Sequence, residues 1–379
     1  MKRFLPTMLA ASCLLAASAA NAFTTYTCNG HDVKWSGNSK TLFAYLPDFP
    51  SGSSERNALI EAVARLNENS SPFVFNLVYT NTVPSLDNDR TEIWIDNIAW
   101  PGVTYTWWDN NCNNFTEKDI IMDSSVSWTS SANKYYQWSY DDPSDTIVAK
   151  RPMESTILHE LGHALGLGHE ADEYNIMGTD WNHMSTNGNA AYTYFGEDAN
   201  HGARYLYGSD GTQDLGVVHW RRIGNNGEYS THGRTRLLDP NTNTELPFTM
   251  VKGEPQYNVN RGQTVRMELT FENNGSAYQY EDVGYYVSTN SYISTGDRLL
   301  TSVSFGQSPA NVYTRYQDVT VPSDLSCSKE YWLGAKIDKD NSLAEFAEWN
   351  NATYIPIKTN WNFSCLVLQP IIIQPLALN

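Results

Sequence analysis

The sequence predicts an α+β unit, a sheet with three helices, followed by an all-β sandwich. A chain of 379 residues is long for one domain and comfortable for two. Its 41% hydrophobic and 13% aromatic residues exclude a disordered protein. In the first half, segments with a helical apolar period are interspersed with short β-rich segments. Beyond about residue 255, apolar and polar residues alternate, so the period changes between the two units.

The first 22 residues predict a secretory signal peptide, with a charged start at Lys2 and Arg3, a short apolar run and a small-residue end at Ala22. Lipid attachment at Cys13 is the alternative, but that cysteine comes unusually early for such a signal. The apolar run is too short to remain as a membrane span, and no other long apolar run exists. We therefore expect a secreted protein without a transmembrane segment.

The net charge of the chain argues against some classes of binding partner. Cleavage after Ala22 removes Lys2 and Arg3 and no acidic residue, so the net charge changes from −17 to −19. Such an acidic chain is a poor partner for nucleic acid and for anionic membrane surfaces. We expect a monomer.

Four cysteines remain after cleavage, an even number in an oxidising compartment. Pairing Cys28 with Cys112 and Cys327 with Cys365 keeps each bridge inside one unit. Spacing alone leaves the other two pairings open.

The first unit begins with an amphipathic helix over residues 54–68, in which Leu59, Ala62, Val63 and Leu66 form one stripe. Short β-rich segments then predict strands at 73–79, 91–100, 103–108 and 119–123. A second helix begins near Pro152, a favoured first-turn residue, and a third covers 196–208.

Residues 209–254 are polar and rich in turns, and they predict a linker or a hairpin formed by 215–222 and 233–238. The sandwich follows over 255–360, and 361–379 form a tail. Its strands show strict alternation, and the apolar positions of two of them are Val265, Met267, Leu269, Phe271, Tyr331, Leu333, Ala335 and Ile337.

The segment HELGHALGLGHE begins at His159 and carries the candidate chemistry. At about 100° per residue, His159 and His163 lie on one face of a helix, opposite an apolar face that includes Leu161 and Leu165. Two histidines at i and i+4 can chelate one zinc ion, and Glu160 can reach a water molecule held there.

The glycines beside the two histidines make a chance pattern of two surface histidines a poor explanation of this motif. Gly162 and Gly166 fall on the histidine side, where we expect that a side chain would crowd a metal or a substrate. Gly166 also suits the left-handed backbone that ends a helix, so that His169 can return as a third ligand. Three protein ligands leave a fourth position open, which is typical of a catalytic zinc site.

At residues 159–169 the sequence resembles the HExxHxxGxxH signature of the metzincin metallopeptidases. The short interval to Met177 and the LYG end of the third helix are most similar to matrixins, over about residues 41–208. The resemblance implies a twisted mixed sheet with three helices over 23–208, one catalytic Zn²⁺ on His159, His163 and His169, and Met177 as the Met-turn beneath it.

The same resemblance implies a mechanism. Glu160 acts as general base toward a zinc-polarised water and then delivers the proton to the leaving amine. The substrate is implied to lie extended along the edge strand, residues 103–107.

The chain also departs from the pattern. Thr179 stands where astacins carry a ligating tyrosine, and Glu170 after the third histidine is astacin-like. His31 is the only histidine upstream of the helix in the mature chain, so a second, structural zinc is not expected. Cys28 lies outside the family's cysteine-switch motif, and a disulfide is favoured over a latency thiol.

Two further residues have weaker assignments. His183, just past the Met-turn, could touch substrate, but a lone exposed histidine more often has no role. Asp198 stands where matrixins anchor a free N-terminus, and a first-turn aspartate favoured by the helix dipole is an equal explanation.

In the second unit, residues 283–300 and 332–351 resemble the CARDB module, a bacterial cell-adhesion-related sandwich of immunoglobulin-like build. The resemblance implies an accessory domain for a surface, a glycan or a protein. Asp338, Asp340 and Asn341 could bind Ca²⁺, but the hard-ligand loop is incomplete and a solvated turn is favoured.

The leading hypothesis is a secreted zinc endopeptidase acting on protein or peptide substrates. One alternative is an adhesion or binding protein in which the sandwich is the main functional part and the zinc site is auxiliary or inactive. Another is a zinc hydrolase for small substrates. Retention of Glu160 argues against an inactive site.

Overall fold

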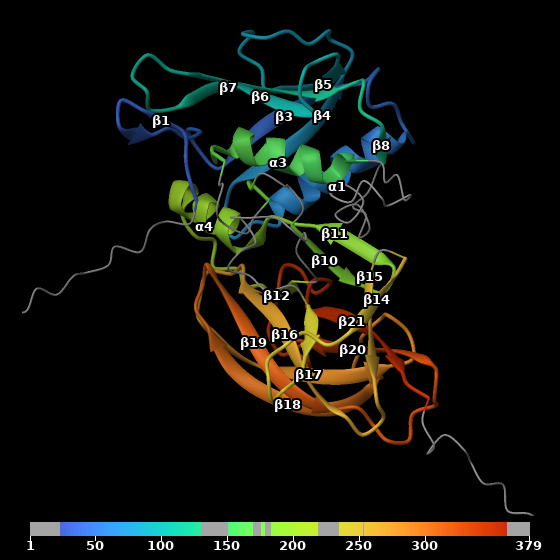
Figure 1. The fold of residues 1–379 in the computed structure, drawn as a ribbon. Coiled ribbons are helices and arrows are strands. Elements are labelled where there is room, and N and C mark those ends of the chain that lie inside the picture. Colours follow the sequence, from blue (N-terminus) through green and yellow to red (C-terminus); the bar gives the residue numbers. More distant parts are fainter. Residues whose placement is uncertain are drawn as a thin grey trace, which may run out of the picture.

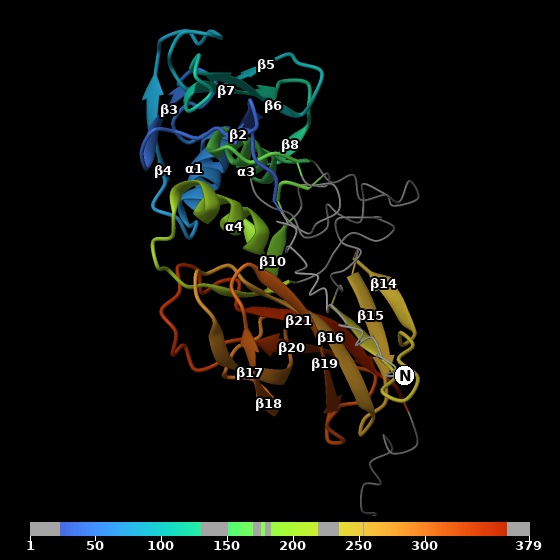
Figure 2. The same ribbon diagram turned by 90° about the vertical axis from the view of Figure 1, so that its left-hand side faces the viewer.

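The computed structural model describes residues 23–129, 151–169, 176–178, 183–218, 235–252 and 254–361. The expected signal peptide, Glu170, Thr179 and Cys365 lie outside these ranges. Within them, no helix is long and apolar enough to cross a membrane. The N-terminal unit lies above the sandwich in Figure 1, and the helices α1, α3 and α4 lie between its sheet and the sandwich (Figures 1 and 2).

The N-terminal unit is built on a five-stranded mixed sheet in the order β4-β3-β5-β7-β6. Its strands are β3 (Ser39–Tyr45), β4 (Val74–Thr80), β5 (Glu92–Asp96), β6 (Gly102–Trp108) and β7 (Phe115–Asp123). Four strands are parallel, and β6 pairs antiparallel with β7 at the edge, as expected for residues 103–107. The sequence did not indicate β3, because only two of its seven residues are fully buried.

In the described part of the chain, three helices lie on the sandwich side of this sheet, as predicted. They are α1 (Ser54–Asn67), α3 (Met153–Leu165) and α4 (Gly196–Tyr207). Ser53 caps α1 by accepting a hydrogen bond from the Arg56 N–H, and the predicted apolar stripe of α1 is buried. In contrast to the two-faced helix expected from the sequence, every residue of α3 is buried. The histidine face of α3 therefore lies inside the protein.

Short strand pairs connect these elements. They are β1 (Thr27–Cys28) with β2 (His31–Asp32), β8 (Trp128–Thr129) with β9 (Arg151–Pro152), and β10 (Met184–Asn187) with β11 (Ala190–Thr193). The β10–β11 hairpin packs on the sandwich, where Thr353 Oγ1 donates a hydrogen bond of 3.0 Å to the Thr186 carbonyl.

The second unit is a sandwich of two sheets, as predicted. One sheet contains β12 (Leu215–Val218), β13 (Arg236–Leu238), β16 (Thr264–Asn273) and β19 (Asn311–Thr320). The other contains β14 (Phe248–Val251), β15 (Glu254–Val259), β17 (Gln279–Ser288), β18 (Arg298–Gln307), β20 (Glu330–Lys336) and β21 (Ala352–Thr359). The alternating apolar residues predicted for β16 and β20 form its core.

The expected hairpin between residues 215–222 and 233–238 is wrong for the part that the structure describes. Strands β12 and β13 do not pair with each other; both pair antiparallel with β16, at different positions along it. Their apolar side chains, Leu215, Val217 and Leu237, belong to the sandwich core. Periodicity could not show this, because both segments are short and lie far from β16 in the sequence.

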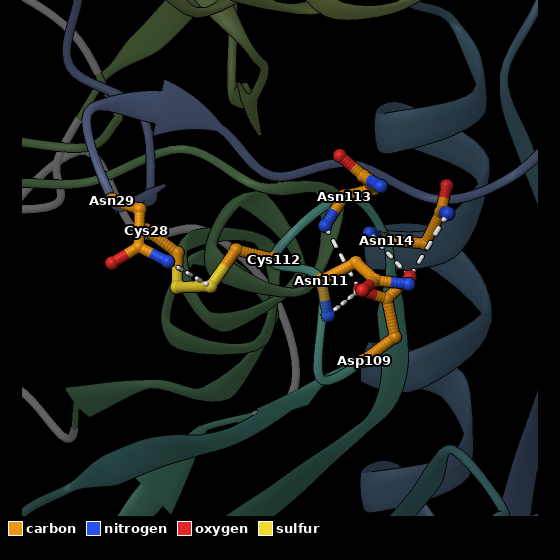
Figure 3. Close-up of a disulfide and its surroundings, with 7 residues drawn as sticks. All are labelled: Cys28, Asn29, Asp109, Asn111, Cys112, Asn113 and Asn114. Carbon is orange, nitrogen blue, oxygen red and sulfur yellow. Dashed lines mark hydrogen bonds between the residues drawn. A yellow bond between two sulfur atoms is a disulfide. The ribbon is translucent and has the colours of Figure 1, made fainter.

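A disulfide joins Cys28 to Cys112, which confirms the first expected pairing and excludes a latency thiol at Cys28 (Figure 3). Asp109 shapes the loop that carries Cys112, since its carboxylate accepts hydrogen bonds from the backbone N–H groups of Asn111, Asn113 and Asn114. Cys327 is also disulfide-bonded. The N-terminal segment is therefore fixed to the loop between β6 and β7.

Replacing both Cys28 and Cys112 with serine should lower the free energy of unfolding by about 2–4 kcal/mol. The physical reason is the freedom regained by the unfolded chain, because the bridge spans a sequence separation of 84 residues. Urea denaturation followed by tryptophan fluorescence measures the change. An unfolding curve that coincides with that of the parent protein would contradict a bridge formed in solution.

Candidate metal centre and active site

Three imidazole rings meet at the C-terminal end of α3. The Nε2 atoms of His159, His163 and His169 lie 3.0 to 3.1 Å from one another. These three side chains form a group whose ligand atoms could hold one metal ion. The structure therefore brings together all three histidines that the sequence proposed as ligands.

Hydrogen bonds on the far side of two rings fix their orientation. His159 Nδ1 lies 2.8 Å from the Ile176 carbonyl, and His163 Nδ1 lies 2.8 Å from the Leu167 carbonyl. A carbonyl can only accept, so each Nδ1 carries the proton and each Nε2 presents a lone pair. Burial also lowers the pKa of all three histidines, that of His163 to about 3. The rings are neutral, which is the form that binds a metal ion.

The third ligand is reached because α3 ends at Gly166. This residue has a φ of 124°, and its N–H closes the helix on the carbonyls of Gly162 and His163. A Cβ at Gly166 would also lie 3.1 Å from both Phe115 and Leu206. The predicted helix stop is confirmed, and packing adds a second reason for glycine.

The N-terminal segment holds the returning chain in place. Tyr26 N–H donates to the Gly166 carbonyl at 3.1 Å, and Gly168 N–H donates to the Thr24 carbonyl at 3.0 Å. Thr24 Oγ1 donates to the His169 carbonyl at 3.0 Å, and a Cβ at Gly168 would overlap Thr24 Oγ1. Sequence reasoning missed this support, because the segment lies about 140 residues before the motif.

Met177 lies directly beneath the histidine helix. A Cβ added at Gly162 would overlap Met177 Sδ. The expectation that Gly162 leaves space for metal or substrate is therefore wrong: its missing side chain admits the Met177 thioether. The thioether in turn supports the turn of α3 between His159 and His163.

Glu160 is held against the edge strand. Thr104 Oγ1 donates a hydrogen bond of 2.7 Å to Glu160 Oε2, and it also lies 3.0 Å from the Glu160 carbonyl. The close approach also requires Gly102, where a Cβ would lie 2.8 Å from Glu160 Oε1. Burial raises the pKa of Glu160 to about 7. The carboxyl group can therefore exchange a proton near neutral pH.

A cavity of about 590 Å³ opens beside these groups. Three segments line it: residues 25–27 of the N-terminal segment, residues 100 and 102–104 around the start of β6, and the motif residues His159, Glu160, His163, Gly168 and His169. The edge strand, the three histidines and Glu160 thus share one open site.

Lys118 is a buried supporting residue that the sequence did not reveal. Its Nζ donates a hydrogen bond of 2.6 Å to the His163 carbonyl and lies 3.9 and 3.8 Å from the ring centroids of Tyr26 and Phe115. Burial lowers the pKa of Lys118 well below its usual value. It adds a second donor to a carbonyl in the last turn of α3 that also accepts a hydrogen bond from the Gly166 N–H.

Three further candidate residues are buried. His183 is not exposed, as had been expected, but completely buried, beside Glu272 of the sandwich. Asp198 lies in the first turn of α4, as expected, and is also buried. Asp338 is 1% exposed rather than solvated, and its carboxylate accepts hydrogen bonds from Ser342 and Leu343 within its own turn. Asp338 also forms a group with Glu345 and Glu348 whose carboxylate oxygens could hold a metal ion, and Asp340 is not a member of that group.

Comparison with known proteins finds one family model that is similar to the part of the chain that carries the site. Residues 109–208 match the model of the Matrixin family of peptidases (Peptidase_M10), a range that contains the histidines, Glu160 and Met177. This part of the chain is thus similar to matrixin metallopeptidases, as the sequence resemblance implied. No curated protein matches the chain.

Solved structures similar to this chain include two determinations of a CARDB domain from Pyrococcus furiosus. One, in complex with di-metal ions, is 14% identical and covers 39% of this chain and 89% of that chain, with a TM-score of 0.25. The other, a solution structure, is 17% identical and covers 29% and 90%, with a TM-score of 0.23. The sporulation control protein of Bacillus subtilis is 15% identical and covers 28% and 46%, with a TM-score of 0.20. Scores of this size carry no argument about the sandwich.

The packing of Gly162 against Met177 can be tested by Gly162→Ala. The added methyl group should lower the free energy of unfolding by about 1–3 kcal/mol, because it overlaps the thioether in a close-packed core. Met177→Ala should recover part of this loss in the double variant, as a double-mutant cycle would show. Gly296→Ala, where the added Cβ meets only Ser294 Oγ at 3.4 Å, is the control. Strictly additive effects of Gly162→Ala and Met177→Ala would contradict the contact.

Proposed function

We propose that this chain is a secreted zinc-dependent endopeptidase that hydrolyses peptide bonds of extracellular proteins. The observation that carries the proposal is the convergence of three neutral imidazole nitrogens beside the Glu160 carboxyl group in an open cavity. The matrixin match over residues 109–208 supports the same reaction class.

The donor set fits zinc. His159, His163 and His169 offer three nitrogen donors with their lone pairs facing one point, and three protein ligands are typical of a catalytic zinc site. When bound there, the ion supplies Lewis-acid polarisation of a water molecule and of the substrate carbonyl.

Glu160 is proposed as the general base. Its carboxylate would accept a proton from the attacking water and return it to the nitrogen of the leaving amine. The hydrogen bond from Thr104 fixes one carboxylate oxygen, so Oε1 can face the cavity that Glu160 lines. Burial, which raises the pKa of Glu160 to about 7, matches that pKa to neutral pH.

The substrate would add to the sheet as a further strand. Strand β6 is the edge of the sheet, and it pairs only with β7 among the described residues. Its first residues, Gly102 to Thr104, line the same cavity as Glu160. An extended peptide can pair with such an edge by backbone hydrogen bonds, which would place its carbonyl group above the histidines. An open edge of this kind favours a polypeptide over a small substrate.

Secretion is supported by the disulfide between Cys28 and Cys112. Disulfides persist in oxidising compartments and are rare in the cytosol. The signal-like pattern of residues 1–22 points to the same location.

Glu160→Gln should reduce the cleavage of casein by the purified protein by about 10²- to 10⁴-fold, because it removes the general base. The three histidines remain in this variant, so its zinc content should equal that of the parent protein. Measuring both quantities separates loss of catalysis from loss of metal. Casein cleavage that survives this substitution, or that survives removal of zinc by a chelator, would contradict the mechanism.

Thr104→Val should lower kcat by about tenfold with little change in KM, because Glu160 loses a hydrogen bond whose geometry positions its carboxylate. Thr106→Val, two residues along the same strand, is the matched control and should retain kcat. Steady-state kinetics on a fluorogenic peptide provide the measurement. Equal effects of the two substitutions would show that the Thr104 hydroxyl does not position the base.

A further inference from the structure

A second group of metal-binding side chains lies where the N-terminal unit meets the sandwich. His183 precedes β10, Glu197 lies in the first turn of α4, and Glu272 belongs to β16. Their ligand atoms all lie within 4.8 Å of one another. We refer to these three residues as the junction cluster. They are 0%, 5% and 0% exposed, respectively, so the cluster is closed to solvent.

The geometry of the junction cluster differs from that of a simple hydrogen bond. His183 Nε2 lies 3.0 Å from Glu272 Oε1 and 3.1 Å from Glu272 Oε2. One N–H can point well at only one of these oxygens. Nearly equal distances fit a nitrogen and two oxygens that surround a common ion. The Nε2 atoms of the catalytic histidines show the same separations of 3.0 to 3.1 Å.

The junction cluster is rich in negative charge. It contains two carboxylates and one imidazole, and Asp198 and Asp214 are buried nearby. A divalent cation placed among the three ligand atoms would be attracted by both carboxylates.

The imidazole ring of His183 in the junction cluster is fixed in place by its neighbours. Gly196 has a φ of 74°, and a Cβ there would lie 2.7 Å from His183 Cε1, so the ring lies directly on the backbone at the start of α4. The Tyr194 ring packs edge-on against His183 at a centroid distance of 4.3 Å. Tyr194 Oη donates a hydrogen bond of 3.1 Å to Glu272 Oε1, which orients that carboxylate in turn.

We propose that His183, Glu197 and Glu272 bind a second divalent metal ion, which fastens the sandwich to α4. One imidazole nitrogen with carboxylate oxygens is the donor set of zinc rather than of calcium, which takes oxygen ligands alone. This ion is structural, because the site is closed to solvent and reaches no cavity that holds Glu160. The inference stands on residues outside the catalytic motif and does not depend on peptidase activity.

Metal content tests the junction site directly. After dialysis against Zn²⁺ and removal of free metal, the full chain should hold two equivalents of zinc by mass spectrometry. The double variant His159→Ala/His163→Ala should hold one, Glu272→Gln should hold one, and the combined variant should hold none. Glu268→Gln is the matched control: Glu268 lies on the same strand and pairs with Arg236 at 2.8 Å, so this variant should keep two equivalents.

One equivalent in the parent protein, or none in the His159→Ala/His163→Ala variant, would overturn the proposal and leave an ion pair at the junction. A measurement on the parent protein alone covers the case in which a variant fails to fold. A chelator should release zinc in two kinetic phases, and the slow phase should coincide with a fall in the thermal unfolding temperature that Zn²⁺ restores and Ca²⁺ does not. Release in one phase, or restoration by Ca²⁺, would also overturn it.

Discussion

The reversal of the chain at Gly166 is the constraint on which the rest of the site depends. Two histidines one turn apart can lie on any helix, but a third imidazole reaches them only if the helix ends within one turn and the chain returns. The positive φ of Gly166 permits that turn, and the backbone bonds of Thr24 and Tyr26 hold the returning segment in register. The disulfide at Cys28 fixes this N-terminal segment to the loop after β6. The third ligand is thus positioned by parts of the chain far from the motif.

The free-energy cost of burying the polar side chains of α3 explains why hydrogen-bonding groups surround this helix. Every residue of α3 is buried, including His159, Glu160 and His163, and buried polar groups require partners. The carbonyls of Ile176 and Leu167 satisfy the Nδ1 atoms of the two histidines, while Thr104 satisfies Glu160. The same bonds set the tautomers and the orientation that metal binding and proton transfer need. The hydrogen bonds that make burial of these side chains stable are therefore the same ones that orient them for metal binding and proton transfer.

Local sequence could predict the site but not its supports. The spacing of His159, His163 and His169, the stop at Gly166 and the helices of the first unit follow from helix geometry, and the structure confirms them. The role predicted for Gly162 was wrong, because spacing does not show that Met177 Sδ fills the space beside this glycine. Three features were not predicted: the contact of Lys118, the pairing of residues 24–26 and the burial of His183. Each depends on a partner between 45 and 145 residues away in the sequence. The predicted pairing of β12 with β13 was wrong for the same reason, because their actual partner β16 is not adjacent to them in the sequence.

In the proposed enzyme, His159, His163 and His169 hold one zinc ion beside Glu160. An anomalous-difference map from crystals of the full chain, collected on both sides of the zinc absorption edge, tests it most directly. We expect a zinc peak about 2.0–2.1 Å from the Nε2 atom of each histidine, with a fourth position open toward the cavity. A map with no zinc peak among the three Nε2 atoms, from protein that was saturated with Zn²⁺, would contradict it.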